Sequence, residues 1–572
     1  MVFELCIRSA RALFYLVLLL PVCVGVMGIV LPAVGYFPAL GETEFSLTAV
    51  HRLLAVEGLP KMVLLALFTS ISATVIALLC TIALLAQFYQ RPALQIIQHG
   101  LSPVLAIPHA ATAIGIGFVL APTGWVARLI ASVTESWQLP PQSSLLYDSQ
   151  GVAIILALAI KELPFILLMA LGVLSQPHLK ARLAAQFAVA QSLGYQRQTA
   201  FIYAVFPVVY SQLKLPIIAV LAYASASVEI PLLLGPQNPP TLAVAILQWF
   251  NHIDLSMRLL ASAAACLQLL VTAGAVGLWL LAERVAKLFF TGLVVNGARG
   301  DGARMIAFCA WLTASVMALM ISVFLVSLLS WSVAGYWPYP QLLPDSVTVQ
   351  HWHTAVQALA GPLANTVWLA GLATPIAVVL VLLFLEGESV AQRCQRRYFT
   401  VDQVLFIPLI VPGVAFLYGL VWCTQWLLPG HVWLPTVVSH LIYVLPYVFL
   451  SLAVAYRRLD IRFINVASSL GASPWQVFLQ VKLPMLFAPV MVAAALGAAI
   501  SFGQYLPTLL ASGGRLATLT TEAVATASGG SRRLTAVYAI MQMLLPLAGF
   551  VLAWLLPRVL FNPAQRHHTG AK

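Results

Sequence analysis

The segment AQSLGYQRQTAFIYAVFP, Ala190 to Pro207, has a counterpart later in the chain, ASSLGASPWQVFLQVKLP, Ala467 to Pro484. The two segments align without a gap, and Ala, Ser, Leu, Gly, Phe and Pro recur at the same offsets. The recurring residues are Ala190, Ser192, Leu193, Gly194, Phe201 and Pro207 in the first copy, and Ala467, Ser469, Leu470, Gly471, Phe478 and Pro484 in the second. Such a duplication predicts a chain built from two related halves.

The composition of the chain is that of a membrane protein. Its 572 residues are 61% hydrophobic and 8% charged, with a mean hydropathy of +0.96. Soluble globular chains carry about 25% charged residues, so this chain has too few charges to cover a surface in water. Its apolar runs are continuous and approach the roughly 20 residues that a spanning helix needs, and a helix satisfies its own backbone polar groups in lipid. The sequence therefore predicts an all-α integral membrane protein.

Neither the net charge nor the residue types that could bind a metal indicate the function of a soluble protein. A charge of +12 reflects, in a membrane protein, the concentration of Lys and Arg in cytosolic loops, so the expected surroundings are a lipid bilayer and not nucleic acid. The seven cysteines contain no CxxC pattern, which predicts neither a disulfide framework nor a metal site. The scattered histidines His109, His440 and the pair His351 and His353 are weak support for metal binding, and no metal site is predicted.

Twelve apolar stretches are candidate spans. In the first half they cover about 12–33, 62–88, 101–121, 151–174, 209–234 and 260–282, and in the second about 305–330, 363–385, 402–428, 434–455, 486–511 and 535–557. The first stretch follows Arg8 and Arg11 and is long for the apolar core of a cleaved signal peptide, so we interpret it as a retained span.

The distribution of positive residues predicts the topology. If both termini are cytosolic, 21 of the 29 Lys and Arg residues lie on the cytosolic side and 7 on the outer side, with Lys161 inside a span. Cytosolic loops carry an excess of Lys and Arg, so this distribution favours cytosolic termini. The loop from Arg515 to Arg533 fits least well, because it places three positive residues on the outer side.

The spans divide into two sets of six. We expect a first transmembrane half over residues 1–282, a charged cytosolic linker over 283–304 and a second transmembrane half over 305–572. Both duplicated segments then fall in cytosolic loops between the fourth and fifth spans of their halves. Each contains a Gly that permits a tight turn and a Pro that favours the start of a new helix. An amphipathic connector at the bilayer surface could show this pattern once, but two copies in matching loops favour docking helices for a cytosolic partner.

The duplicated segments resemble the coupling segment of type I ABC importer permeases, whose pattern is roughly E-A-A-x3-G-x9-I-x-L-P. The spacing from Gly to Pro matches in both copies, and VKLP, Val481 to Pro484, follows the end of the pattern closely. The leading Glu is replaced by Ala188 in the first copy and by Asn465 in the second. The fused two-half layout is similar to that of the ferric-iron and thiamine permeases and their uncharacterised relatives.

This resemblance implies the remaining parts of a transport system. The chain would be the multi-pass permease subunit of a bacterial inner-membrane importer, with two cytosolic ABC ATPase subunits and a periplasmic solute-binding protein as partners. ATP and Mg²⁺ would bind to the ATPase subunits and no cofactor to this chain, which contains no G-x4-G-K-[ST] loop. Recognition in such importers lies mainly on the binding protein, so ferric iron, thiamine and other small solutes stay open.

Ionisable residues inside spans are candidates for the translocation pathway, because charges in a bilayer are costly. Lys161 and Glu162 lie within the fourth span, Glu229 lies in the outer half of the fifth, and Gln504 lies near the equivalent place in the second half. In the resembling family, a Glu or Gln at this place often faces the pathway. The alternative is a structural role, in which Lys161 and Glu162 pair with separate polar partners.

Two other classes of membrane protein are alternatives to an ABC importer permease. An ion- or proton-coupled secondary transporter is also often built from repeats, but it has no need for matched cytosolic docking segments. A membrane-embedded enzyme would show clustered catalytic groups at one membrane face, and the 17 acidic residues form no such cluster along the chain. The prediction is therefore an ABC importer permease that is not itself an enzyme.

Overall fold

The computed structural model describes residues 2–134, 137–142, 145–297, 299, 302–393 and 404–561. These residues form helices joined by loops, with isolated β-bridges at two places. Ten helices are long and apolar enough to cross a membrane, and two bent helix pairs raise the number to twelve. The predicted all-α membrane fold is confirmed. The C-terminal tail, with Arg566 and Lys572, and the residues Cys394, Arg396 and Arg397 lie outside the described residues.

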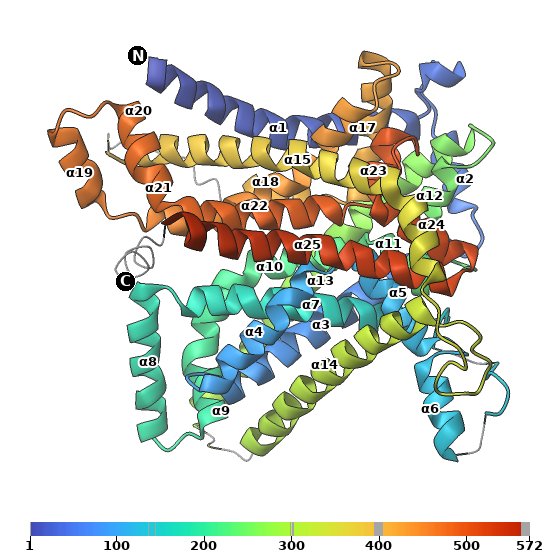
Figure 1. Cartoon of the computed structure of the whole chain (residues 1–572), viewed down its shortest axis with the longest axis horizontal. Coiled ribbons are helices and arrows are strands. Elements are labelled where there is room, and N and C mark those ends of the chain that lie inside the picture. Colours follow the sequence, from blue (N-terminus) through green and yellow to red (C-terminus); the bar gives the residue numbers. More distant parts are fainter. Residues whose placement is uncertain are drawn as a thin grey trace, which may run out of the picture.

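The helices run roughly side by side in one bundle (Figure 1). The long helices of the first half are α1 (Val2–Ala33), α3 (Leu59–Phe88), α4 (Pro92–Ala106), α5 (His109–Leu120), α7 (Val152–Leu174), α10 (Phe206–Ser225) and α13 (Met257–Val295). Those of the second half are α14 (Gly302–Val333), α15 (Gln350–Arg393), α17 (Gly413–Leu427), α18 (Trp433–Arg457), α22 (Phe487–Phe502) and α25 (Arg532–Phe561). Shorter helices at one end are α2 (Thr48–Leu54), α6 (Trp125–Thr134), α12 (Leu242–Phe250) and α24 (Leu519–Gly529).

The first helix of each half packs against the other half. Helix α1 lies along α15 and α17, and α14 lies along α3 and α5 (Figure 1). Small residues allow the closest of these approaches, as is common where helices meet in a membrane. A Cβ on Gly419 of α17 would lie 1.9 Å from the carbonyl oxygen of Gly25 on α1, and a Cβ on Gly28 would lie 2.6 Å from the Gly419 Cα. The two halves are therefore interlocked.

The fifth span of each half is broken at the same place. Helix α10 ends at Ser225 and a short helix α11 (Glu229–Leu234) follows, while α22 ends at Phe502 and α23 (Leu506–Ser512) follows. Pro231 and Pro507 lie just after these breaks, and a proline has no N–H to donate to the carbonyl four residues earlier. The spans predicted at 209–234 and 486–511 therefore contain a break that the apolar pattern did not indicate.

Other boundaries also differ from the prediction. The stretch 101–121 contains the end of α4 and the whole of α5, separated at Ile107 and Pro108, because a residue before proline is disfavoured in the α conformation. Helix α13 continues to Val295, so most of the predicted linker is helical. The division of the chain into halves at 283–304 stays a prediction.

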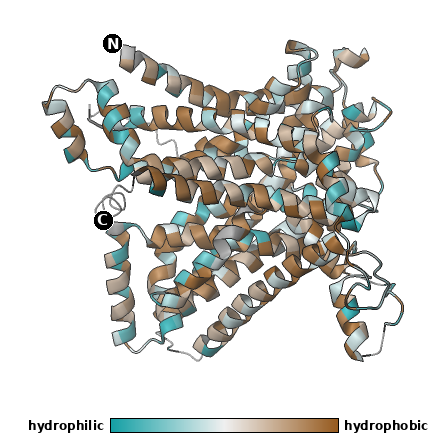
Figure 2. Cartoon of the chain, in the orientation of Figure 1, coloured by the Kyte–Doolittle hydropathy of each residue, from teal (hydrophilic) through white to brown (hydrophobic). Residues whose placement is uncertain are grey.

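Figure 2 shows apolar residues along the middle of the long helices and polar residues gathered towards the two ends of the bundle. The buried residues form a central cluster with members from both halves, and one further cluster for each half near the end where the chain begins. A bundle with an apolar middle and polar ends matches a protein that crosses a bilayer.

Candidate functional site

The two duplicated segments form helical hairpins that project from the same end of the bundle (Figure 1). The first hairpin, residues 177–207, contains α8 (Pro177–Ser192), α9 (Arg197–Ala200) and the π-helical turn η2 (Phe201–Val205). The second hairpin, residues 461–485, contains α19 (Ile461–Ser469), α20 (Pro474–Gln476), the π-helical turn η4 (Val477–Lys482) and α21 (Leu483–Met485). The N-terminal end of α1 and the C-terminal end of α25 lie at the same end of the bundle.

Each hairpin turns at its recurring glycine. Gly194 has a φ of +87° and Gly471 a φ of +82°, a left-handed conformation that costs other residues about 1–2 kcal/mol. The hydrogen bonds are the same in both copies. The glycine N–H donates to the carbonyl three residues earlier, and the next N–H donates to the carbonyl five residues earlier, which is the Schellman arrangement of a helix end. The turn at each glycine is confirmed.

The exposed face of each hairpin carries an apolar pair one helical turn apart. On α8 and its C-terminal end these residues are Val189 and Leu193, and on α19 and its end they are Val466 and Leu470. The leucines are 56% and 82% exposed. Sequence reasoning singled out both leucines and missed both valines. The signal was present, because two apolar residues at positions i and i+4 recur just before the glycine in both segments.

Other recurring residues point into the protein. Phe201 is buried, with its ring centroid 5.2 Å from that of Tyr89. Phe478 is buried beside Trp475, at 6.2 Å between ring centroids. Burial raises the pKa of the Tyr89 phenol, so this side chain stays neutral and packs as an aromatic ring. The two phenylalanines therefore anchor the hairpins and do not belong to their exposed faces.

The remaining residues of the duplicated pattern divide between the exposed face and the anchored side. Exposed are Ser192, Gly194, Pro207, Ser469, Gly471 and Pro484, while Ala190 is buried and Ala467 is half-buried. Ala188 and Asn465, which replace the leading Glu of the coupling pattern, are both exposed. Neither hairpin thus presents a carboxylate at that position.

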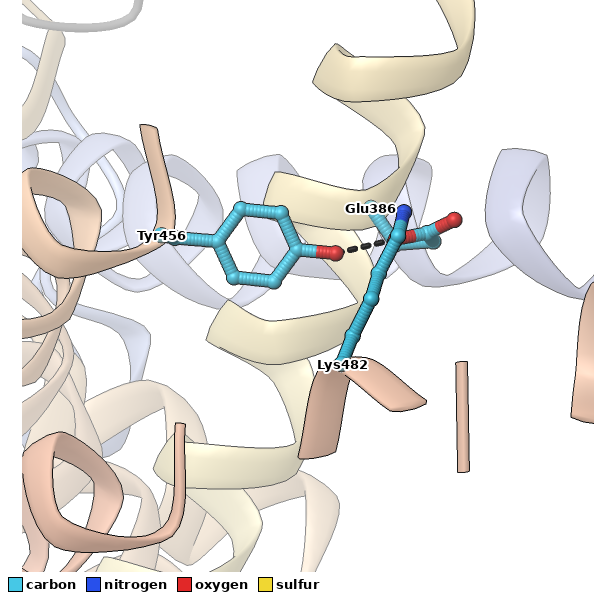
Figure 3. Close-up of polar contacts among 3 residues, drawn as sticks. All are labelled: Glu386, Tyr456 and Lys482. Atoms are coloured by element: carbon cyan, nitrogen blue, oxygen red, sulfur yellow. Dashed lines mark hydrogen bonds and ion pairs between the residues drawn. The ribbon is translucent and has the colours of Figure 1, made fainter. Parts of the chain in front are cut away.

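A buried ion pair attaches the second hairpin to the bundle, and sequence reasoning missed it. Figure 3 shows the Lys482 ammonium beside the Glu386 carboxylate of α15, with the Tyr456 hydroxyl of α18 reaching the same group. The Lys482 Nζ lies 2.5 Å from the Glu386 Oε2, and the side chains are 2% and 5% exposed. The Tyr456 hydroxyl donates to the same oxygen. The first hairpin is attached differently: the Gln198 Nε2 donates to the Gln87 Oε1 at 2.7 Å, and Arg197 donates to the Tyr89 carbonyl.

Lys161, one of the four candidate pathway residues, makes contacts that support the structure of the bundle. Its ammonium donates to the carbonyls of Val104, at 3.0 Å, and Leu105, at 3.3 Å, and also to that of Ile107. These carbonyls belong to the C-terminal end of α4, where a cation is favoured by the helix dipole. Lys161 therefore holds the break between α4 and α5.

The two glutamates belong to α7 and α11. Glu162 is buried on α7. Glu229 is the first residue of α11, and its carboxylate faces the backbone N–H of Tyr505 in the second half. Within the described residues, the Oε2 of Glu229 has no hydrogen-bond partner. Gln504 is half-buried and precedes Tyr505 in the other break, so the structure brings the two breaks together where the halves meet.

At the opposite end of the bundle, contacts within the protein hold Arg128 and also Arg532, one of the three positive residues in the loop that fitted the topology least well. Arg532 donates to the Thr123 hydroxyl and lies over the ring of Trp331, 5.4 Å from its centroid. Arg128 is buried and donates to the carbonyls of Pro338, at 2.9 Å, and of Gln341. Specific contacts within the protein therefore hold both arginines.

Two of the histidines have ordinary polar partners. His440 lies 2.8 Å from the Ser501 hydroxyl and 2.9 Å from the Thr508 hydroxyl, and the His351 Nε2 lies 3.2 Å from the Ala334 carbonyl. Within the described residues no group of three or more His, Cys, Asp or Glu side chains could hold a metal ion.

Comparison with known proteins identifies the family. Residues 357–560 match the family described as the binding-protein-dependent transport system inner membrane component. The inner membrane ABC transporter permease protein YnjC of Escherichia coli (strain K12) is 32% identical over 513 residues, which cover 90% of this chain and 91% of YnjC.

Two further relatives are similar to parts of the chain. The putative 2-aminoethylphosphonate transport system permease protein PhnV of Salmonella typhimurium is 30% identical over 34% of this chain and 71% of its own length. The molybdenum transport system permease protein ModB of Haemophilus influenzae is 26% identical over 26% of this chain and 66% of its own length. All of these relatives are named as permease components, and none as an ATPase. The chain therefore belongs to the inner membrane permeases of binding-protein-dependent ABC transport systems.

Proposed function

We propose that this chain builds the complete membrane pathway of its importer and that each hairpin docks one ATPase subunit. The observation that carries the proposal is the matched pair of exposed faces, Val189 with Leu193 and Val466 with Leu470, on two hairpins at one end of the bundle. Apolar residues exposed together on a projecting segment are typical of a protein interface. Two equivalent faces fit two copies of one ATPase.

The hairpin end of the bundle is, in this proposal, the cytosolic end. The N-terminus of α1 and the end of α25 would then both be cytosolic, and the end with α2, α6, α12 and α24 would face the periplasm and receive the solute-binding protein. The excess of positive residues on the side of the termini supports this orientation. The membrane is the bacterial inner membrane.

Transport would follow from rocking of the two interlocked halves. ATP and Mg²⁺ bind between the partner ATPase subunits, whose closure moves the hairpins, and the bundle alternates between openings to the two sides. Glu229, Gln504 and Glu162 would line the pathway where the two helix breaks meet, because buried carboxylates in a membrane require a function or a partner. Lys161 would support this region through its contacts with α4.

The cargo is a small solute delivered by the binding protein. The printed names of PhnV and ModB refer to 2-aminoethylphosphonate and molybdenum for those proteins, and the resemblance to fused permeases adds ferric iron and thiamine. The pathway residues do not single out one of these. The family decides the class of transporter: an ABC importer permease is supported over an ion-coupled secondary transporter.

The test is purification of the tagged chain from detergent-solubilised membranes, with mass spectrometry of the proteins that accompany it. The proposal predicts an ABC ATPase at two copies for each copy of this chain. A single ATPase copy, or none under conditions that preserve a known importer complex, would contradict docking at both hairpins. The control is the variant in which Leu193 and Leu470 are both replaced by Asp, which should lose the ATPase while the permease stays intact.

A further inference from the structure

The two hairpins are joined to the bundle by different chemistry at the same place. Residue 482 in the second hairpin and residue 205 in the first are equivalent, since both precede the recurring proline by two positions. In the second hairpin this residue is Lys482, paired with Glu386 of α15 (Figure 3). In the first it is Val205, which is buried among apolar residues. Within the described residues no ion pair joins the first hairpin to α3, the helix equivalent to α15.

The register of the chain places Lys482 against α15. Lys482 is the last residue of the π-helical turn η4, and such turns are rare and often found at functional sites. One additional residue in a turn rotates the side chains that follow by about 100°, the share of one residue in a 3.6-residue turn. The turn η2 in the first hairpin occupies the equivalent position, so the backbone is the same and the difference lies in the side chain.

The ion pair resists relative movement more strongly than the neutral amide pair of the first hairpin. A charge-assisted hydrogen bond is roughly twice as strong as a neutral one, and separating a buried pair leaves two uncompensated charges. The Tyr456 hydroxyl binds the same oxygen, and Arg457 pairs with Glu388 at 3.0 Å, so α15 and α18 are joined to each other and to the hairpin. The first hairpin meets α3 through a neutral amide pair, Gln198 with Gln87, through a bond from Arg197 to the Tyr89 carbonyl, and through apolar packing of Phe201 against Tyr89.

We propose that Lys482 and Glu386 are positioning residues that transmit movement of the second hairpin to α15 and α18, and that the two ATPase subunits are therefore coupled unequally to the membrane helices. This inference rests on the proposed docking of ATPase subunits at the hairpins. When α19 and α20 move, the ion pair makes α15 move with them. The first hairpin, in contrast, can shift relative to α3.

The experiment is hydrogen exchange with mass spectrometry on the purified permease–ATPase complex, with and without a non-hydrolysable ATP analogue. The key variant is K482M/E386Q, which removes both charges, keeps the side-chain volumes similar and leaves an amide oxygen for the Tyr456 hydroxyl. It avoids the unpaired buried charge that K482M or E386Q alone would create. The matched control in the first hairpin is Q198M/Q87M.

In the wild-type complex, the analogue should change exchange in α19, α15 and α18. In K482M/E386Q the change in α19 should persist while the change in α15 falls by about tenfold, within the usual range of coupling between sites. The charge-swapped variant K482E/E386K should restore most of it, and Q198M/Q87M should alter the response of α3 by less than about twofold. If the charge-swapped pair restores the response of α15, the ion pair itself transmits the movement. A merely structural role would not produce this recovery.

An unchanged response of α15 in K482M/E386Q, or lower stability with an unchanged response, would overturn the inference while leaving the docking proposal in place. An equal loss in Q198M/Q87M would overturn the asymmetry between the two hairpins. Absence of the ATPase from the wild-type complex would contradict the proposed function itself, and this inference with it. The same preparation therefore distinguishes the two failures, because ATPase content is measured before exchange begins.

Discussion

Val189 on α8 and Val466 on α19 are 277 residues apart in the chain and are exposed to nearly the same extent, 58% and 59%. Each is followed one helical turn later by an exposed leucine and then by a glycine in the left-handed conformation. Exposure of an apolar pair at equivalent positions of two diverged halves indicates a shared requirement on both hairpins. Docking of two identical partner subunits meets that requirement.

Replacing the exposed leucines should remove the ATPase without unfolding the permease. We expect Leu470→Asp and Leu193→Asp each to weaken ATPase binding at the altered hairpin by about 2 kcal/mol, the level of an interface hot spot, which is about thirtyfold in affinity. ATPase content after size-exclusion chromatography measures the effect. The control is Ile253→Asp, since Ile253 is 98% exposed in the loop after α12, and α12 lies at the end of the bundle opposite to the hairpins. ATPase loss in this variant would contradict a specific hairpin site.

The glycine turns should tolerate no β-branched residue. Gly471→Val places a side chain at a φ of +82°, although there is open space around its Cβ, so the cost of about 1–2 kcal/mol comes from the backbone. We expect lower ATPase content with little change in the melting temperature of the permease, because the hairpin lies outside the bundle. Gly172→Ala, on α7 with open space and no positive φ, is the control. Full ATPase binding by Gly471→Val would show that the turn conformation is dispensable.

The interlocked halves predict a strong stability effect far from the hairpins. Gly419→Leu forces a side chain into the backbone of α1, where the Cβ alone would lie 1.9 Å from the Gly25 carbonyl oxygen. Overpacking of this kind costs about 1–3 kcal/mol, occasionally more, and should lower the melting temperature in detergent. Gly371→Leu on α15, which has open space around its Cβ, should behave as wild type. Equal stability of the two variants would argue against the contact between α1 and α17.

Lys161 and Glu229 should differ in the kind of defect they cause. Lys161→Met removes a cation from the carbonyls of Val104 and Leu105, and hydrogen bonds to charged groups contribute about 1.5–3 kcal/mol, so it should destabilise the permease. Thermal unfolding in detergent checks this expectation. A melting temperature equal to that of wild type would show that Lys161 does not stabilise the permease.

Glu229→Gln keeps the shape of the side chain and replaces its ionisable carboxyl group with an amide at the meeting point of the two helix breaks. We expect normal assembly and melting temperature, with uptake reduced by about tenfold, which corresponds to about 1.4 kcal/mol on the transport barrier. Uptake of the solute carried by the co-purified binding protein measures it in proteoliposomes. Wild-type uptake would reduce Glu229 to a structural residue.

The sequence predicted the features that depend on local pattern. Apolar runs gave twelve spans and the all-α fold, and the recurrence of Gly194 and Gly471 gave the two turns, because only glycine adopts such a conformation at low cost. The breaks before Glu229 and Leu506 could have been foreseen from Pro231 and Pro507. The apolar pattern of those spans concealed them.

Long-range features were beyond the sequence. The packing of α1 against α17 depends on which glycines meet across the two halves, and the pattern of one helix does not name its partner. Glu386 lies at the end of an apolar span, 96 residues before Lys482, so nothing local relates the two. The π-helical turns arise from a shift of hydrogen bonds in the helix, which has no residue-level signal in these segments.

The central claim is that both hairpins contact ATPase subunits. It is tested most directly by a photo-crosslinking amino acid placed at Leu193, at Leu470 or, as a control, at Ile253 in the purified complex. The account predicts that illumination crosslinks the ATPase to the permease from Leu193 and from Leu470 and not from Ile253. An intact complex that crosslinks from neither hairpin would contradict it.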